Sequence, residues 1–383
     1  MKKKFLNVIS LALAVLAAFP VMAADASDVL AGVRKSVAPD ARQVVFDLKV
    51  EGNVLTGVTS EQSALEAAVE ALAAADIKVE NRAEVYPYDN MGLVSIPVAS
   101  LRTRPAHAGE MATQAVMGTP VRLLEHKDGW YRLQTPDGYI AYVPDSSVIP
   151  VDKARYDAWR ADDNRLVAVN LWQSHAWQTP EANKPREVVT DIVLGTIVEP
   201  VKDVAPVGSR ILVALPDGRR GWVEKSEFVP VKVWADQPFD VERILDTAYS
   251  LEGAPYLWGG TSIKSVDCSG LVKVSYLNNG LILRRDASQQ ALTGTRLEAS
   301  EWPSYRAGDL MFFGNASTGR VTHVAIYDHD GKYVHSSGRV KRNSVDPESP
   351  DYLYSPLHAV RIHGNEGTEG IVRAIDHPWY FNK

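Results

Sequence analysis

Apolar and polar residues alternate along much of the chain, a pattern typical of short β-strands. Residues 44–50 and 53–58 alternate on either side of a Glu-Gly pair, which predicts a β-hairpin. Residues 60–75 change to helical spacing, and residues 77–79 return to the strand pattern. We therefore expect a small α+β unit over residues 24–87, in the order β-β-α-β.

The middle of the chain repeats one strand–turn–strand pattern. The Pro-Asp-Gly turn at residues 136–138 recurs at residues 216–218, and each turn separates short alternating strands. Such a repeat predicts two copies of one small β-domain. We place the first copy at residues 88–150 and the second at residues 165–233, joined by a helical linker over residues 151–164.

The last region, residues 240–383, opens with a helical pattern capped by Asp240 and contains the candidate nucleophile. Cys268 is the one cysteine among 383 residues. The helical pattern of residues 271–277 places it at or near a helix N-terminus. There the helix dipole and unpaired N–H groups favour thiolate over thiol, so we expect Cys268 to be alkylated at a lower pH than a free cysteine.

Two histidines follow on neighbouring predicted strands. His323 begins an alternating strand, and a turn at residues 328–331 folds the chain back toward His335. His323 is then positioned to take the proton of Cys268, and His335 lies opposite, in reach to fix the tautomer of His323. These residues predict a Cys-His-His triad and catalysis through an acyl-enzyme.

The first residues resemble an export signal. Three lysines after Met1, an uncharged apolar run and a final Val-Met-Ala predict a signal peptide over residues 1–23. We therefore expect an exported protein, periplasmic or extracellular, with no stable membrane insertion after cleavage. Structural cysteines in such oxidising compartments come in disulfide pairs, so the solitary Cys268 favours a nucleophile.

Charge and histidine spacing exclude several function classes. The formal net charge is −6 and no basic block occurs, which argues against nucleic-acid binding. The histidines outside the triad show no metal-ligand spacing. We expect a monomer that uses no metal and no other cofactor.

Four motifs of the last region resemble the NlpC-type cell-wall cysteine peptidases. They are Pro-Tyr-Leu-Trp-Gly-Gly from residue 255, Asp-Cys-Ser-Gly-Leu-Val from residue 267, Gly-Asp-Leu from residue 308 and His-Val-Ala-Ile-Tyr from residue 323. The repeated β-segments resemble bacterial SH3-like barrels. The resemblance implies a multidomain fold: two small all-β SH3-like barrels and an α+β papain-like cysteine peptidase domain, preceded by the small α+β unit.

Within this family the domain order resembles the gamma-D-glutamyl-L-diamino acid endopeptidases of murein peptide recycling. These enzymes cut L-Ala-gamma-D-Glu-diamino acid peptides before the diamino acid, lysine or diaminopimelate, when L-Ala has a free amine. The resemblance implies that Asp286 and Ser269 bind the L-Ala ammonium, that Tyr139 of the first barrel reaches the same group, and that Asp267 lines the pocket.

One position departs from the family pattern. Such enzymes can place a glutamate directly before the Thr-Gln of the first barrel, where this chain has Ala112. Glu110, two residues earlier on the same face of the predicted strand, is the substitute we expect.

Two alternatives stay open at this stage. The protein could be a non-catalytic wall-binding protein anchored by its barrels, although a pure binder has no need of a lone reactive thiol. It could also be a murein-remodelling amidase or acyltransferase on the intact wall, because hydrolysis and transfer share the same acyl-enzyme.

Overall fold

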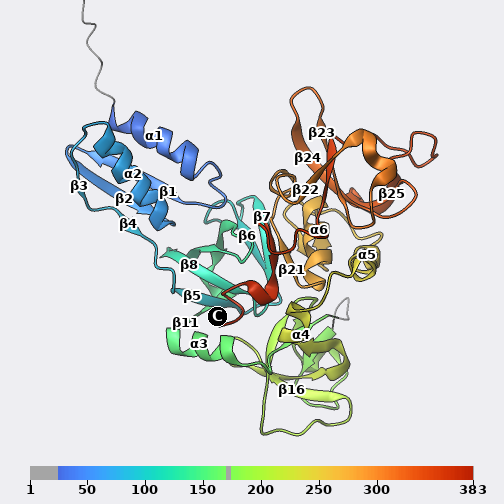
Figure 1. Ribbon diagram of the computed structural model, residues 1–383. Coiled ribbons are helices and arrows are strands. Elements are labelled where there is room, and N and C mark those ends of the chain that lie inside the picture. Colours follow the sequence, from blue (N-terminus) through green and yellow to red (C-terminus); the bar gives the residue numbers. More distant parts are fainter. Residues whose placement is uncertain (1–24, 170–173, 383) are drawn as a thin grey trace, which may run out of the picture. The chain divides into compact units, whose positions relative to one another are not determined.

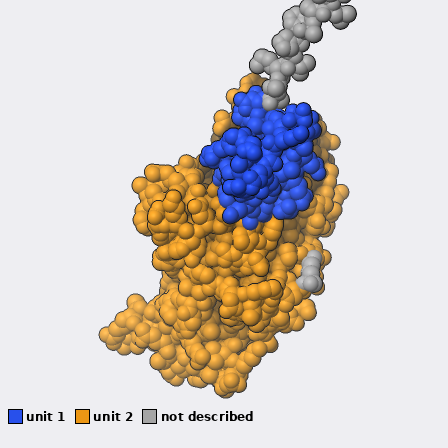
Figure 2. Space-filling model, turned by 90° about the vertical axis from the view of Figure 1, so that its left-hand side faces the viewer, with its two compact units in different colours: residues 1–39, 46–85 blue, residues 40–45, 86–383 orange. Residues whose placement is uncertain are grey.

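The computed structural model describes residues 25–169 and 174–382 (Figure 1). The predicted signal peptide over residues 1–23 lies outside the described residues. The chain forms two compact units (Figure 2). The smaller unit contains the described residues up to Pro39 and Phe46–Val85, and the larger unit contains Asp40–Val45 and the chain from Tyr86 onward. No helix among the described residues is long and apolar enough to cross a membrane.

The smaller unit places two helices with one mixed sheet. Its elements are α1 (Ala26–Val37), β1 (Phe46–Glu51), β2 (Val54–Thr59), α2 (Gln62–Ala74), β3 (Glu80–Asn81) and β4 (Glu84–Val85). The predicted hairpin is confirmed: β1 pairs antiparallel with β2, and Gly52 takes a φ of 63° in the turn. The predicted helix is confirmed as α2.

Two features of the smaller unit differ from the prediction. Helix α1 was not predicted at all. The returning strand is β3 and β4, both parallel to β2, and not residues 77–79. The N–H of Ile77 still bonds the carbonyl of Leu72 and closes the end of α2, so the chain cannot yet join the sheet there.

The larger unit contains two seven-stranded antiparallel sheets, one for each predicted barrel. The first has the order β11-β5-β8-β9-β10-β6-β7 and the second β14-β13-β17-β16-β15-β12-β18. In both, a two-stranded hairpin turns at the Pro-Asp-Gly sequence, where Gly138 and Gly218 have φ angles of 84° and 85°. Only glycine adopts this left-handed conformation without strain, which explains the repeated turn. The predicted linker helix is α3 (Lys153–Ala161).

The strands of the first sheet are β5 (Met91–Val94), β6 (Val98–Arg102), β7 (Met111–Val116), β8 (Pro120–Lys127), β9 (Trp130–Gln134), β10 (Ile140–Pro144) and β11 (Val148–Val151). Those of the second are β12 (Leu166–Ala168), β13 (Ser174–Trp177), β14 (Val188–Ile192), β15 (Ile197–Pro200), β16 (Arg210–Ala214), β17 (Arg220–Glu224) and β18 (Phe228–Pro230).

The last region packs helices against a six-stranded sheet of order β22-β27-β23-β24-β25-β26. Its helices are α5 (Val241–Ser250), α6 (Cys268–Asn278) and α7 (Ala287–Gln290), and the short helix α4 (Val231–Ala235) precedes the region. The sheet is formed by β22 (Thr295–Glu298), β23 (Leu310–Asn315), β24 (Arg320–Tyr327), β25 (Lys332–Ser337), β26 (Arg339–Ser344) and β27 (His358–Arg361). Two short pairs complete it: β19 (Thr261–Ser262) with β20 (Ser265–Val266), and β21 (Leu281–Leu283) with β28 (Ile371–Arg373).

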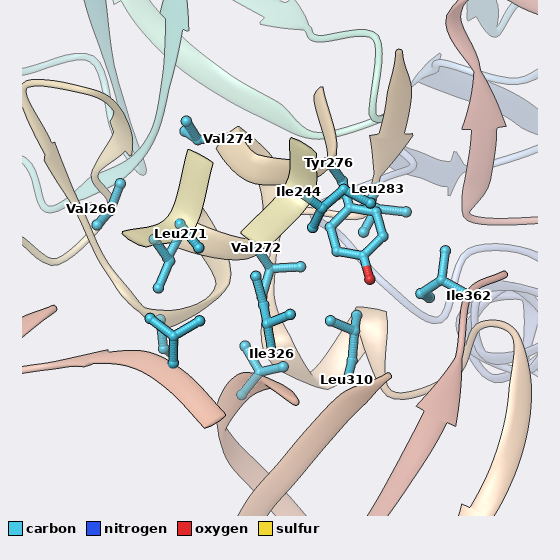
Figure 3. Packing of buried hydrophobic residues seen from close by; sticks show 14 of the residues in the cluster. Ile244, Val266, Leu271, Val272, Val274, Tyr276, Leu283, Leu310, Ile326 and Ile362 are labelled. Atoms are coloured by element: carbon cyan, nitrogen blue, oxygen red, sulfur yellow. The ribbon is translucent and has the colours of Figure 1, made fainter. Parts of the chain in front are cut away.

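Helix α6 lies at the centre of this region. Its residues Leu271 and Val272 are fully buried in one cluster with Leu310 of β23 and Ile326 of β24 (Figure 3). The helical pattern predicted after Asp240 is α5, and the carboxylate of Asp240 caps it by accepting from the N–H of Arg243. Because apolar side chains hold α6 against the sheet, the N-terminus of α6 has a fixed place in the core.

Candidate active site

Cys268 is the first residue of α6, as the sequence predicts. Asp267 is the N-cap, and its Oδ1 accepts from the N–H of Gly270 at 2.7 Å. Its Oδ2 accepts from the N–H of Gly259 at 2.9 Å. A Cβ added to Gly270 would lie 1.9 Å from the carbonyl oxygen of Gly260. The Asp-Cys-Ser-Gly motif therefore has a steric reason for its glycine and a capping reason for its aspartate.

Arg285 holds this helix start in place, although the sequence analysis did not select it. Its side chain is 1% exposed, and Nη2 and Nη1 donate to the two carboxylate oxygens of Asp267 at 2.6 and 3.2 Å. Nη1 also donates to Oγ of Ser269 at 2.8 Å, and that hydroxyl donates to Asp267. A buried N-cap carboxylate needs a cationic partner, but no sequence signal says which arginine supplies it.

The two histidines meet as the hairpin predicts. Strands β24 and β25 pair antiparallel, and Nε2 of His323 lies 2.8 Å from Nδ1 of His335. Nε2 of His335 in turn lies 3.0 Å from Oδ1 of Asn343 on β26. Asn343 was not predicted, because it pairs with Tyr333 in the register of β25 with β26 and reaches His335 diagonally across the two strands, which no local pattern marks.

The hydrogen bonds that run from Asn343 through His335 to His323 determine which nitrogen of His323 can act as a base. The Nδ2 of Asn343 donates to the carbonyl of Asp351 at 3.0 Å, so its Oδ1 faces His335 as an acceptor. His335 must then carry its proton on Nε2 and accept on Nδ1. His323 donates through Nε2, which leaves its Nδ1 unprotonated in the neutral ring. That nitrogen is the one available to take a proton from a thiol.

The sulfur of Cys268 lies against the strand that carries His323. The residue is 7% exposed, and the N–H groups of Val324 and Ser269 face the thiol. Within the described residues no hydrogen bond joins the sulfur to the ring of His323. The structure thus brings the thiol to the same stretch of β24 as His323, which directly precedes Val324, the residue whose N–H faces the sulfur.

The protonation of these groups differs from the expectation. Burial raises the pKa of the Cys268 thiol to about 11, and the charge of Asp267 acts in the same direction. Burial lowers the pKa of His323 to about 3 and that of His335 to about 4. The expected low thiol pKa is therefore wrong for the resting site, because loss of water outweighs the dipole of α6. The resting pair is a neutral thiol and a neutral imidazole.

The three remaining predicted ligands are Asp286 and Tyr139, a pair close to Arg285, and one outlying residue, Glu110. Asp286 is the N-cap of α7, and its Oδ1 lies 3.8 Å from Nη1 of Arg285, which also binds Asp267 and Ser269. Tyr139 is buried, and after burial itself the charge of Asp286 is the largest cause that raises its pKa, so the two side chains lie close together.

Glu110 lies outside this cluster. It is exposed and directly precedes β7, where its carbonyl accepts from the N–H of Thr103. In the part of the chain that the structure describes, its carboxylate contacts neither Tyr139 nor Asp286. The structure therefore does not bring Glu110 to the group that it was expected to help bind.

Two sets of polar contacts attach the first barrel to the last region beside the thiol. The hydroxyl of Thr261 accepts from the N–H of Gln114 at 2.8 Å, and Oε1 of Gln114 accepts from the N–H of Thr261 at 3.0 Å. Nζ of Lys273 on α6 lies 2.6 Å from Oδ2 of Asp137, in the turn that leads to Tyr139. Because this pair is mostly buried, it fixes the barrel turn relative to α6.

A metal ion has no evident place here: over residues 25–169 and 174–382, no three His, Cys, Asp or Glu side chains are grouped as ligands.

Comparison with known proteins gives the family. Residues 253–361 match the NlpC/P60 family, and residues 101–148 match the bacterial dipeptidyl-peptidase SH3 domain. The chain is 27% identical over 261 residues to a gamma-D-glutamyl-L-lysine dipeptidyl-peptidase of Bacillus cereus. This match covers 64% of this chain and 74% of that protein. The chain is also 28% identical over 269 residues to dipeptidyl-peptidase 6 of Lysinibacillus sphaericus, which covers 68% of this chain and 93% of that protein.

A solved structure supports the fold independently. An NlpC/P60 family protein from Bacillus cereus superposes with a TM-score of 0.60 at 20% identity, over 71% of this chain and 99% of that one. The predicted fold class, SH3-like β-domains with an α+β peptidase domain, is confirmed. Together the two domain matches and the cysteine at the start of α6 identify the chain as an NlpC/P60-family cysteine peptidase with a bacterial SH3 domain.

Proposed function

We propose that this protein hydrolyses the gamma-D-glutamyl–diamino acid bond of free murein peptides that carry an N-terminal L-Ala. The observation that carries the proposal is the series Asn343–His335–His323, which ends at a basic Nδ1 beside the strand that Cys268 contacts. The relatives named as gamma-D-glutamyl-L-lysine and other dipeptidyl-peptidases support the choice of bond.

The reaction begins with a neutral Cys268 thiol and a neutral His323 imidazole. Since the thiol pKa lies near 11, Cys268 loses its proton to Nδ1 of His323 as the sulfur attacks the gamma-carbonyl of D-Glu, and not before. The carbonyl oxygen becomes an oxyanion, and the N–H of Cys268 at the open first turn of α6 is a donor for it. His323 then gives the proton to the departing amine of the diamino acid, and a thioester remains.

Water completes the cycle. His323, neutral again, takes a proton from water as the water oxygen attacks the thioester, and the thiolate leaves and recovers that proton. The products are L-Ala-gamma-D-Glu and the amine of the diamino acid. Between turnovers His335 accepts a hydrogen bond from Nε2 of His323, which keeps Nδ1 of His323 unprotonated.

Asp286 with Tyr139 forms the amine subsite of the proposal. A charge-assisted hydrogen bond between the L-Ala ammonium and Asp286 selects peptides with a free terminus. N-acetylated L-Ala loses it, at a cost of about 1.5–3 kcal/mol, or a factor of roughly ten to a hundred in rate. Peptides still joined to muramic acid carry an amide there and are expected to be poor substrates.

The test compares the wild type with Cys268→Ala and His323→Ala on L-Ala-gamma-D-Glu-diaminopimelate and on its lysine analogue. Products are identified by mass spectrometry, and circular dichroism verifies the fold. We expect no cleavage by Cys268→Ala and a loss on the order of a thousandfold for His323→Ala. Cleavage by folded Cys268→Ala would overturn the assignment.

Two additions to this assay separate the alternatives. A primary amine in the mixture gives an amide product if the enzyme is an acyltransferase. Equal rates on free and N-acetylated peptides would indicate a remodelling hydrolase of the intact wall. We also propose export to the periplasm or the exterior, which N-terminal sequencing of the mature secreted protein tests against the predicted cleavage after Ala23.

A further inference from the structure

A short segment from the N-terminal part of the chain belongs to the larger unit and reaches the amine subsite. Residues Asp40–Val45 form a turn in which the N–H groups of Gln43 and Val44 bond the carbonyl of Asp40. The carbonyl of Arg42 accepts from the N–H of Ile140 at 2.6 Å, directly after Tyr139. Backbone contacts therefore hold this segment beside the proposed site.

The side chain of Arg42 bridges two carboxylates. Its Nε and Nη2 donate to Oδ1 and Oδ2 of Asp40 at 2.8 and 2.7 Å, in the bidentate geometry that arginine forms with carboxylates. Its remaining nitrogen, Nη1, donates to Oδ2 of Asp286 at 2.7 Å. Gln289 of α7 supports Asp40 through a bond of 2.8 Å from Nε2 to Oδ2.

We propose that Arg42 is a specificity-determining residue of the amine subsite: its Nη1 takes the place on Asp286 that the substrate ammonium must claim. The inference rests on the proposed function, since it assumes that Asp286 receives the L-Ala amine. Guanidinium N–H and ammonium N–H are both cationic donors, so they compete for the same carboxylate oxygen. A peptide without a free amine cannot displace Arg42 from it.

The charges around the site fit such an exchange. The cluster holds three carboxylates, Asp40, Asp267 and Asp286, against two guanidinium groups, Arg42 and Arg285. One negative charge is left over, and one bound ammonium balances it. Electrostatics alone therefore favours the addition of one monocation to this cluster.

Breaking the contact between Arg42 and Asp286 costs little free energy. Asp40 accepts hydrogen bonds from two nitrogens of Arg42 whether or not Asp286 accepts one from the third. Displacing Arg42 from Asp286 therefore leaves no unpaired guanidinium. The Arg42 side chain is 40% exposed and Asp286 is 28% exposed, so the bridge between them is a weak, solvated one. Such pairs change an equilibrium by roughly two- to fivefold, which sets the size of the expected effect.

Two substitutions should act in opposite directions. Arg42→Ala removes the competitor, so KM for a peptide with free L-Ala should fall by about two- to fivefold, and the effect should be on KM rather than on kcat. Asp40→Asn weakens the other partner of Arg42, so the guanidinium should bind Asp286 more firmly and KM should rise. Neither change should alter KM for the N-acetylated peptide by the same factor, because that peptide has no ammonium to compete.

Arg82 supplies the matched control. It lies in the smaller unit and binds Glu80, two residues before it, through Nε at 2.8 Å and Nη2 at 3.1 Å. Arg82→Ala removes the same type of local ion pair far from α7 in sequence and should leave the kinetic constants as in the wild type. Thermal unfolding of all three variants verifies that each is folded.

The outcomes separate this inference from the proposed function. If the wild type cleaves no murein peptide, the proposed function fails. Calorimetry of Cys268→Ala and of Cys268→Ala/Arg42→Ala with L-Ala-gamma-D-Glu then still measures the competition, and equal dissociation constants or no binding overturn it. If the wild type cleaves the free peptide but Arg42→Ala raises KM or leaves it unchanged, Arg42 only orients Asp286 or the segment, and the competition is refuted.

Discussion

Loss of the buried ion pair between the first barrel and α6 should damage both stability and substrate binding. Nζ of Lys273 lies 2.6 Å from Oδ2 of Asp137, and their side chains are 17% and 3% exposed. Lys273→Met leaves the carboxylate buried without its cation, which typically costs 3–5 kcal/mol. Asp137 keeps the hydroxyl of Thr135 as a donor, so we expect the lower end, about 3 kcal/mol.

The contribution of the Lys273–Asp137 pair to stability depends on pH through the pKa of Asp137. Burial would raise the pKa of Asp137, but the charge and hydrogen bond of Lys273 outweigh it and hold that pKa below its usual value. The pair therefore stabilises the protein above about pH 4, the unfolded pKa of aspartate, and the contribution is lost as pH falls through the lower folded value. Lys273→Met removes the two largest causes that lower the pKa of Asp137 and leaves the burial that raises it, so the variant takes up the proton at a higher pH than the wild type. The stability lost by Lys273→Met should therefore be largest near pH 7 and become smaller as pH falls toward pH 4.

The ion pair between Lys264 of the last region and Asp191 of the second barrel offers a control. Nζ of Lys264 lies 2.8 Å from Asp191 of β14, but both side chains are about one third exposed, so Lys264→Met should cost less than about 1 kcal/mol. Urea unfolding followed by tryptophan fluorescence measures both variants. Because Asp137 precedes Tyr139 by two residues, Lys273→Met should also raise KM for free L-Ala peptides, whereas Lys264→Met should not. Similar, small losses for the two variants would refute the reasoning.

Two further predictions concern protonation. Burial lowers the pKa of His335 to about 4 and that of His323 to about 3, so the unfolded chain binds more protons below its histidine pKa of about 6.5. The free energy of unfolding should therefore fall as pH drops from 6.5 to 4, by up to ~1.4 kcal/mol per pH unit for each histidine. Urea titrations should show a shallower fall in His335→Asn, and an unchanged slope would contradict the assignment. Since burial raises the pKa of Cys268 to about 11, its iodoacetamide labelling rate should keep rising from pH 8 to 10; a plateau below pH 8 would show that a thiolate is already present at rest.

Local sequence determined the elements that carry the site. Asp240 and Asp267 cap the helices that follow them, and the Asp-Gly turn between β24 and β25 brings His335 within hydrogen-bond distance of His323, diagonally across the two strands. Capping, turn geometry and the two-residue period of a strand depend on residues a few positions apart, so they can be read without knowing the fold. The position of Cys268 at a helix start and the proximity of the two histidines were predictable for this reason.

Only the tertiary structure decided what surrounds those groups. Asp267 meets Arg285, Asp286 meets Arg42, and His335 meets Asn343 through pairings that the sequence does not mark. For the same reason the predicted strand position of Glu110 is wrong: β7 begins at Met111, so Glu110 precedes the strand, and no local pattern marks where that strand begins.

The thiol of Cys268 shows the same division most directly. Its place at a helix N-terminus follows from the sequence, and that place by itself predicts a lowered pKa. Its burial against β24 depends on segments that are distant in the chain, and burial raises the pKa instead. Sequence determines which groups are present and their local geometry, whereas the loss of water around them is a property of the packed molecule.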